Sequence, residues 1–282
     1  MRDFVLETAL GRIAGLRGGV DGGARVLALH GWLDNAASFL PLAEQLDGID
    51  LVALDLPGHG ASAHLPPAAD YLATSAARAA FAAADALGWE RFALLGHSLG
   101  GSIASLMAAA QPQRIARLVS IESLGLLVET EERTAARLRE AFAAQVGLAA
   151  KQLRVFADID TAVRARMQGI GRVNEVAARL LVERGIARVD GGYVWRSDPR
   201  LTLPTLVRMT EAQVRDLLGG IECPTRVIYA APAQSYFAEP LRSERAALLP
   251  RGELVVLPGG HHLHMEDAAA VAAAIGDFFL RD

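Results

Sequence analysis

Short apolar runs alternate with longer, alanine-rich amphipathic stretches along most of this chain. Residues 4–19 (FVLETALGRIAGLRGG) carry two short runs around a glycine turn, which predicts a β-hairpin. The later runs are almost wholly apolar, as in strands that are buried on both faces of a sheet. They lie at residues 26–30, 51–55, 91–97, 116–122, 225–230 and 253–257. Helices are predicted between them, at residues 34–46, 71–87, 99–111 and 267–280. Alternation of this kind indicates a mostly parallel sheet with helices on both faces.

The alternation stops between about residues 125 and 218, where the chain becomes helical and rich in arginine and glutamate, with no clear buried strand. We therefore expect a helical insertion at 125–218 that forms a cap over a core made of residues 1–124 and 219–282. Its arginines alternate with alanine and glutamate, which is typical of solvated helix faces. The alternative is that one of them recognises a carboxylate or phosphate on a substrate. They include Arg133, Arg137, Arg139, Arg164, Arg166 and Arg172.

Composition narrows the class of protein. The 282 residues are 52% hydrophobic and carry a net charge of −4, which argues against nucleic-acid binding. No apolar run reaches the ~18 residues needed to cross a bilayer, and acidic residues stand where a signal segment would be apolar. Cys223 is the only cysteine, so no internal disulfide can form, which fits a reducing compartment. We expect a cytoplasmic protein without a membrane span.

Lys151, the only lysine, is the one candidate for Schiff-base chemistry.

The strongest chemical signal is the pentapeptide GHSLG at residues 96–100. It joins a predicted buried strand to a predicted helix, the setting in which G-x-S-x-G holds a nucleophilic serine on a sharp turn. Gly96 and Gly100 lack Cβ atoms, so the strand and the helix can approach closely around Ser98. The alternative is a glycine-rich turn with Ser98 as an ordinary helix N-cap. The flanking elements favour the nucleophile.

The motifs around this turn resemble those of the α/β-hydrolase superfamily. The shared segments are His30-Gly31-Trp32, LDLPGHG at 54–60, GHSLGG at 96–101 and Gly260-His261. Together with HGWLDNAASF, SDPRL and GGHHLHMED, they are similar to the serine hydrolase-like subfamily. The resemblance implies an α/β-hydrolase fold with a mostly parallel eight-stranded sheet and a helical cap. It also implies a hydrolase that needs no cofactor and no metal.

An oxyanion hole is implied by the same resemblance, after the first buried strand. Its two donors would be the backbone N–H groups of Trp32 and Leu99, aimed at the negative oxygen of a tetrahedral intermediate. Packing is the alternative role for the side chains of His30 and Trp32. We expect His30, Gly31 and His97, which border these donors, to line the substrate site.

Three histidines follow the last predicted strand, where the superfamily places its catalytic base. An acidic or polar residue often lies five positions after that base, and Glu266 lies five after His261. His261 is therefore our choice, with His262 as the alternative, while His264 is expected to line the pocket. Three histidines also suggest a metal site, but the step from His262 to His264 is not a usual zinc spacing, so we predict no metal.

The carboxylate that would orient the base is where this chain departs most clearly from the superfamily pattern. The superfamily usually supplies an aspartate after the penultimate strand, and here the expected position falls near Ala233. Glu122, at the end of the strand after the nucleophile helix, is our choice, because some superfamily members place their acid there. Glu239 is the alternative, although it fits the first turn of a helix. Asp55 is expected to fix the LPGHG turn instead.

These residues predict a serine hydrolase that acts on an ester of a small or medium acyl group. Ser98 would attack the acyl carbon, His261 would transfer protons and Glu122 would orient His261. A thioesterase or lactonase would use the same parts. A non-catalytic ligand-binding homologue is the alternative from another class, favoured only by the unusual acid. The partner is expected to be a small molecule, and the oligomeric state is left open.

Overall fold

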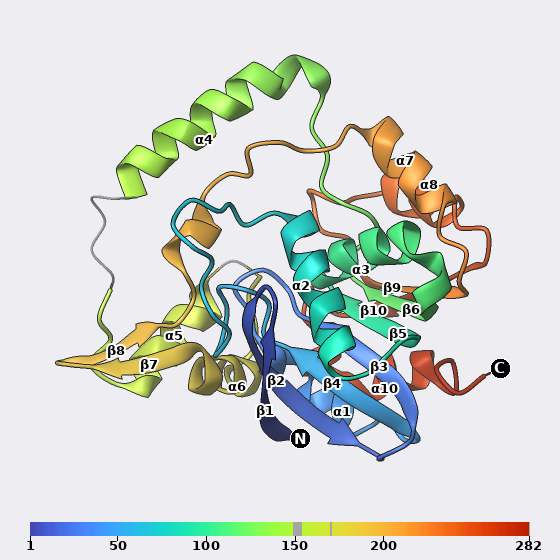
Figure 1. The fold of residues 1–282 in the computed structure, drawn as a ribbon, viewed down its shortest axis with the longest axis horizontal. Coiled ribbons are helices and arrows are strands. Elements are labelled where there is room, and N and C mark those ends of the chain that lie inside the picture. The colour runs from blue at the N-terminus through green and yellow to red at the C-terminus, as the bar shows by residue number, and fades with distance from the viewer. Residues whose placement is uncertain (149–153, 170, 282) are drawn as a thin grey trace.

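A computed structural model describes residues 1–148, 154–169 and 171–281. Its main sheet has eight strands in the order β1-β2-β4-β3-β5-β6-β9-β10 (Figure 1). Only the two pairings that involve β2 are antiparallel; the other five are parallel. The mostly parallel eight-stranded α/β fold is therefore confirmed. The strands are β1 (Arg2–Thr8), β2 (Gly11–Gly19), β3 (Ala24–Leu29), β4 (Ile49–Leu54), β5 (Phe92–His97), β6 (Ile115–Ile121), β9 (Thr225–Ala231) and β10 (Gly252–Pro258).

Helices cover both faces of the sheet. On one face, α2 (Ala73–Ala86) and α3 (Leu99–Ala110) bury side chains such as Phe81 and Met107 against the strands. On the other, α1 (Leu40–Ala43) and α10 (Ala268–Ile275) bury Leu42 and Ile275. The alanine-rich sequence favours this arrangement, because alanine is the best helix former and lets helices lie close to a sheet. The remaining short elements of the core are η1 (Ala36–Phe39), η2 (Pro112–Arg114), α8 (Leu241–Ala246) and α9 (Leu263–Glu266).

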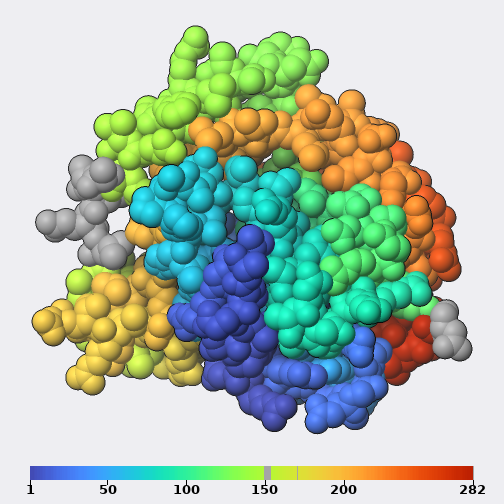
Figure 2. Space-filling view, in the orientation of Figure 1, coloured from blue at the N-terminus to red at the C-terminus, as the bar shows by residue number. Residues whose placement is uncertain are grey.

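The chain between β6 and β9 has two parts. The 3-10 helix η3 (Glu131–Arg133) and α4 (Thr134–Leu148) lie at the rim of the molecule, and within α4 only Arg137 and Ala141 are buried (Figures 1 and 2). In the second part, α5 (Ile159–Gln168) and α6 (Glu175–Gly185) share a small hydrophobic cluster of their own. A two-stranded sheet follows, β7 (Ile186–Val189) and β8 (Gly192–Trp195), then η4 (Pro199–Thr202) and α7 (Glu211–Gly219).

The segment expected to be helical also contains a β-hairpin. The β7–β8 hairpin was not predicted, because its strands are half-exposed and have no uninterrupted apolar run. Lys151 lies outside the described residues. Among the helices of the described ranges, none is long and apolar enough to cross a membrane.

Candidate active site

Ser98 sits on a strained turn between β5 and α3. Its backbone has φ 51° and ψ −116°, a conformation that a residue with a side chain rarely adopts. The flanking glycines explain how the turn closes. A Cβ atom on Gly96 would lie 2.5 Å from the Gly100 oxygen, and one on Gly100 would lie 1.8 Å from the Leu29 oxygen. Only glycine fits at either position, and the half-buried Ser98 is held out at the carboxyl end of the sheet.

Positive φ angles mark the site more widely. Among the described residues, the non-glycine positions with positive φ are Leu33, Ser98 and Glu122, at 60°, 51° and 57°. All three follow the carboxyl ends of neighbouring strands, β3, β5 and β6. Backbone strain of this kind costs of order 1–3 kcal/mol per residue and is concentrated at functional sites. The strain therefore singles out this edge of the sheet, independently of any motif.

His261 lies between Ser98 and Glu122. Its Nε2 atom is 3.0 Å from Ser98 Oγ, and its Nδ1 atom is 3.1 Å from Glu122 Oε2. With its proton on Nδ1, the neutral ring donates to the carboxylate and accepts from the serine hydroxyl. Three residues from distant parts of the sequence thus form one hydrogen-bonded line. The alternative base, His262, points away, with its Nε2 atom 3.0 Å from Asp34 Oδ2.

The carboxylate of Glu122 is fixed on both sides. Its Oε1 atom accepts from the Ala230 N–H at 2.5 Å and from Arg242 Nη2 at 2.8 Å, which leaves Oε2 for His261. Strand β6 lies between β5 and β9, so a carboxylate after β6 reaches the same imidazole as one placed after β9. That adjacency explains how the acid can occupy this strand.

The other acidic candidates have different partners. Glu239 is exposed, and its Oε2 atom accepts from the N–H and the hydroxyl of Ser243 on α8. Asp55 is fully buried and accepts from the Ala36 and Ala61 N–H groups, so it fixes its turn as expected. Glu122 is the candidate that contacts His261.

Arg242 was missed by the sequence analysis. It lies on α8, is 3% exposed and also donates to the Ala230 carbonyl oxygen at 2.8 Å. Its guanidinium group lies 3.9 Å from the centre of the Tyr229 ring. The sequence gives no signal for this residue, because its contact with Glu122 spans 120 positions.

The two expected oxyanion donors follow the carboxyl ends of β3 and β5, which are neighbouring strands. Neither the Trp32 N–H nor the Leu99 N–H has a hydrogen-bond partner among the described residues. Leu99 is the first residue of α3, where an N–H has no acceptor within its own helix. The Trp32 side chain is 37% exposed and donates from Nε1 to the Leu201 carbonyl oxygen at 2.8 Å. Both N–H groups are therefore available to an incoming oxygen.

Comparison with known proteins agrees with this geometry. A family model described as the alpha/beta hydrolase fold matches residues 24–268. The chain belongs to the α/β-hydrolase family.

Relatives of this α/β hydrolase include a serine hydrolase-like protein of Dictyostelium discoideum, 29% identical over 92% of this chain and 75% of that one. A pimeloyl-[acyl-carrier protein] methyl ester esterase of Chromobacterium violaceum is 31% identical over 74% of this chain and 76% of its own. Among solved structures, a hypothetical protein of Pseudomonas aeruginosa is 41% identical over the whole of both chains, with a TM-score of 0.95. A thioesterase domain from the curacin biosynthetic pathway is 25% identical over 100% and 99% of the chains, with a TM-score of 0.84. The resemblance to the serine hydrolase-like proteins is confirmed, and the chain is a hydrolase of this family.

Two buried histidines hold the loops of this hydrolase. His30 accepts from the Leu56 N–H at 3.0 Å, and His59 accepts from the Leu33 N–H at 3.3 Å. Burial lowers the pKa of His30, and lowers that of His59 to about 3. Both rings are therefore neutral at pH 7, as a ring nitrogen that accepts a hydrogen bond must be.

A second group of histidines packs behind His261. His97 Nε2 donates to the His261 carbonyl oxygen at 2.8 Å, and the ring of His264 lies 4.0 Å from that of His97. Burial lowers the pKa of both rings. The side chains of His30, His97 and His264 have no exposed surface, which does not fit the expected contact with a substrate. Instead, His30 binds the Leu56 N–H, His97 binds the His261 carbonyl oxygen, and His264 packs against His97.

A metal could be considered at one place among the described residues. Ligand atoms of Asp34, His97 and His262 lie within 4.8 Å of one another. However, Arg166 Nη2 donates to Asp34 Oδ1 at 2.7 Å and lies 3.3 Å from His262 Nε2. A guanidinium cation thus already balances the carboxylate, and the set does not favour a divalent ion.

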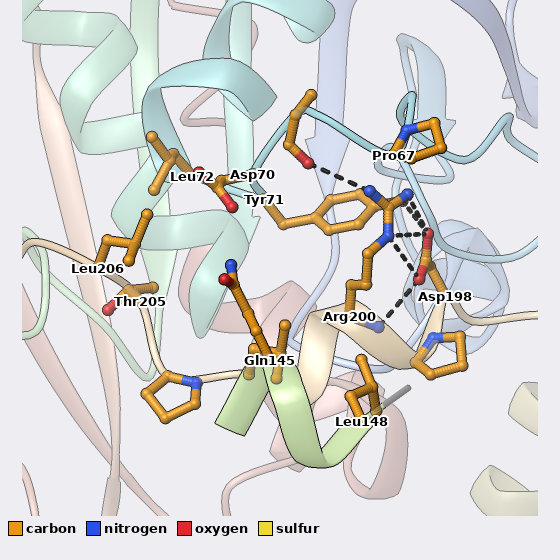
Figure 3. Close-up of a pocket in the computed structure, with 14 residues that line it drawn as sticks. Pro67, Asp70, Tyr71, Leu72, Gln145, Leu148, Asp198, Arg200, Thr205 and Leu206 are labelled. Carbon is orange, nitrogen blue, oxygen red and sulfur yellow. Dashed lines mark hydrogen bonds and ion pairs between the residues drawn. The ribbon is translucent and has the colours of Figure 1, made fainter. Parts of the chain in front are cut away.

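A cavity of about 480 Å³ lies between the segment before α2, the end of α4 and the η4 segment (Figure 3). Gln145 of α4 and Leu203, just after η4, belong to its lining, and Arg200 stacks on Tyr71 at one side. Its lining contains neither Ser98 nor His261. It is linked to the site through η4, since Leu201 of that helix accepts from Trp32.

Proposed function

We propose that this protein hydrolyses carboxylic esters of a small or medium acyl group through an acyl-enzyme on Ser98. The proposal rests on one observation above the others. His261 lies 3.0 Å from Ser98 Oγ through Nε2 and 3.1 Å from Glu122 through Nδ1. A base that is both in contact with a nucleophile and oriented by a carboxylate is the arrangement that acyl transfer requires.

In the first half of the reaction, Ser98 Oγ attacks the acyl carbon while His261 Nε2 takes the hydroxyl proton. The carbonyl oxygen becomes an oxyanion that accepts from the Trp32 and Leu99 N–H groups. One such donor is worth about 2.7–4 kcal/mol in the transition state. The imidazolium that forms is stabilised by Glu122, and it gives its proton to the leaving alcohol as the C–O bond breaks. The acyl group remains on Ser98.

In the second half, a water molecule gives a proton to His261 Nε2 and attacks the acyl-enzyme. The same donors hold the second oxyanion. His261 then returns the proton to Ser98 Oγ as the acid product leaves. Atoms and charge balance without a cofactor.

The ester assignment is supported by the surroundings of the site and by one relative. Two exposed aromatic residues border it: Trp32, and Tyr236, whose ring centre is 6.4 Å from that of His261. Such a rim suits an uncharged acyl group. The pimeloyl ester relative acts on an ester, by its name. A thioester is the second candidate, favoured by the likeness to the curacin thioesterase domain.

Residues 125–218 act, in this proposal, as a cap over a core of residues 1–124 and 219–282. Contacts across this division support it. Arg184 of α6 makes a two-atom contact with the buried Asp55, with Nη2 2.8 Å from Oδ2. The Asn35 side chain donates to the Leu181 carbonyl oxygen at 2.8 Å. Closing the site in this way excludes water from the reacting atoms.

Turnover of p-nitrophenyl butyrate by four proteins tests the proposal. Wild type should be active and Ser98→Ala inactive, while Ser235→Ala, an exposed serine after β9, should keep full activity. Glu122→Gln should lose about 10³- to 10⁴-fold in kcat, because an amide no longer stabilises the imidazolium.

The matched control for the acid is Glu239→Gln, which should retain wild-type kcat. If Glu239→Gln loses activity and a folded Glu122→Gln does not, the assignment of the acid is wrong. A folded wild-type protein that turns over neither the ester nor a butyryl thioester would favour the ligand-binding alternative.

A further inference from the structure

A buried charged cluster lies behind His261. Arg166 of α5 donates from Nη2 to Asp34 Oδ1 at 2.7 Å, and Asp34 Oδ2 lies 3.0 Å from His262 Nε2. The side chains of Arg166, Asp34 and His262 are 12%, 1% and 3% exposed. The expectation that the arginines of this segment lie on solvated faces is therefore wrong for Arg166, and also for Arg137 of α4, which is 8% exposed. Arg164, two residues earlier on the same helix, is exposed as expected.

The cluster touches both halves of the candidate site. His97 donates to the His261 carbonyl oxygen at 2.8 Å, and His97 Nδ1 lies 3.9 Å from Asp34 Oδ2. The loop before Trp32 rests on the same atoms: a Cβ on Gly31 would lie 2.9 Å from His97 Nδ1 and 3.0 Å from Asp34 Oδ2. A shift of Asp34 would therefore move the base and an oxyanion donor together.

Arg166 supplies a positive charge beside the buried carboxylate of Asp34. Burial raises the pKa of Asp34, but the nearby His262 and Arg166 outweigh it and hold that pKa well below its usual range. Asp34 is thus a carboxylate without access to water. A buried charge whose partner is removed is costly, so the loop around it would rearrange.

Arg166 also holds the segment after its own helix, and the residue before α6 contacts the core. Arg166 Nη1 donates to the Gly171 carbonyl oxygen at 3.0 Å, and the Asn174 N–H donates to Glu266 Oε1 at 2.7 Å. Glu266 ends α9, the helix that follows His262. The α5–α6 part of the insertion is therefore joined at several points to the segment that carries His261.

We propose that Arg166 is a positioning residue for catalysis, which aligns His261 and the oxyanion loop by neutralising Asp34 from the inserted segment. The inference rests on the proposed ester hydrolysis. It makes the α5–α6 part of the insertion a fixed component of the catalytic site, in addition to any role in enclosing the substrate.

The test compares Arg166→Met, Arg166→Lys and the control Arg164→Met, which removes an exposed arginine from the same helix. Each folded protein is assayed with p-nitrophenyl butyrate and with a fluorophosphonate probe. Arg166→Met should lower kcat about 10- to 100-fold, since small misplacements of catalytic groups have effects of this size, with KM little changed. Labelling should slow in parallel, Arg166→Lys should recover part of the loss and Arg164→Met should match wild type.

The double variant Asp34→Asn/Arg166→Met removes both charges, so it leaves no uncompensated carboxylate and carries the same comparison if Arg166→Met does not fold. Its kcat should lie below that of wild type and of Arg164→Met, with KM little changed, because the pair that aligns the loops is absent; where Arg166→Met folds, the double variant should lose no more than it does, since both changes act on one cluster. A wild-type kcat in the folded double variant would also count against the inference. Wild-type kcat and labelling in folded Arg166→Met, or a change in KM alone, would overturn the inference. Wild-type protein that neither turns over nor labels would overturn the proposed function, and this inference with it.

Discussion

At the scale of single residues, the site depends on one carboxylate held by long-range contacts. Glu122 follows β6, has a positive φ of 57° and divides its two oxygens between Arg242 and His261. Glu122 was chosen as the acid because some superfamily members place theirs at the end of this strand, and its contact with His261 agrees with that choice. The orientation of its carboxylate was not predicted, because that requires a guanidinium group from α8. Arg242 thus comes from the helix that follows the loop after β9, where the superfamily usually places its acid.

Removing Arg242 tests this division of roles. We expect Arg242→Met to lower kcat about 10-fold, because a charge-assisted hydrogen bond of about 1.5–3 kcal/mol no longer orients Glu122. Arg242→Lys keeps the charge and should retain more activity. Initial rates with p-nitrophenyl butyrate, beside thermal unfolding of each variant, measure the effect. Full kcat in folded Arg242→Met would show that Glu122 does not need this partner.

At the scale of elements, the core follows closely from the sequence, and the insertion does so only in part. Apolar runs located all six parallel strands. Five of them are largely buried, and such strands have little choice of residue type. Strand β10, at the edge of the sheet, keeps an apolar run although most of its residues are exposed. The β7–β8 hairpin and the burial of Arg166 could not be predicted, since both depend on how the insertion packs. Ser98 and His261 were chosen as nucleophile and base from their motifs, and the structure places Oγ and Nε2 3.0 Å apart. The cluster around Asp34 has no motif.

The cavity beside η4 gives a prediction about acyl length. Leu203 lines it and lies two residues from Leu201, which contacts Trp32. We expect Leu203→Trp to reduce the volume and to lower kcat/KM for p-nitrophenyl octanoate several-fold more than for the acetate. The measured quantity is the ratio of the two values, with Leu203→Ile as a control of similar size. An unchanged ratio in Leu203→Trp would mean that the acyl chain does not enter this cavity.

At the scale of the whole molecule, four buried histidines make stability depend on pH. Burial lowers the pKa values of His30, His59, His97 and His264 in the folded protein, while in the unfolded chain each is close to 6.5. Between these values the unfolded state binds more protons than the folded state. The stabilisation is therefore complete above about pH 6.5 and is lost as the pH falls towards the folded-state values.

Urea unfolding at pH 7.5, 6 and 5 measures this loss. Each such histidine should contribute up to about 1.4 kcal/mol per pH unit to the free energy of unfolding in that window. Asp34 adds nothing there, because its lowered pKa matters only below its ordinary value of 3.8. His264→Leu should give a shallower dependence of stability on pH, because it removes one of the four histidines with a lowered pKa. The substitution costs no hydrogen bond, since neither ring nitrogen of His264 has a hydrogen-bond partner among the described residues. Equal stability of the wild type at pH 7.5 and 5 would contradict this account.

The central claim is that Ser98 is the nucleophile, activated by His261. The most direct measurement is covalent labelling with a fluorophosphonate probe, followed by peptide mapping of the modified residue. We predict one label per chain, on Ser98, and none in Ser98→Ala. Labelling should slow strongly in His261→Ala, because the hydroxyl then has no base at 3.0 Å. A label on another residue, or an equal rate in folded His261→Ala, would contradict the account.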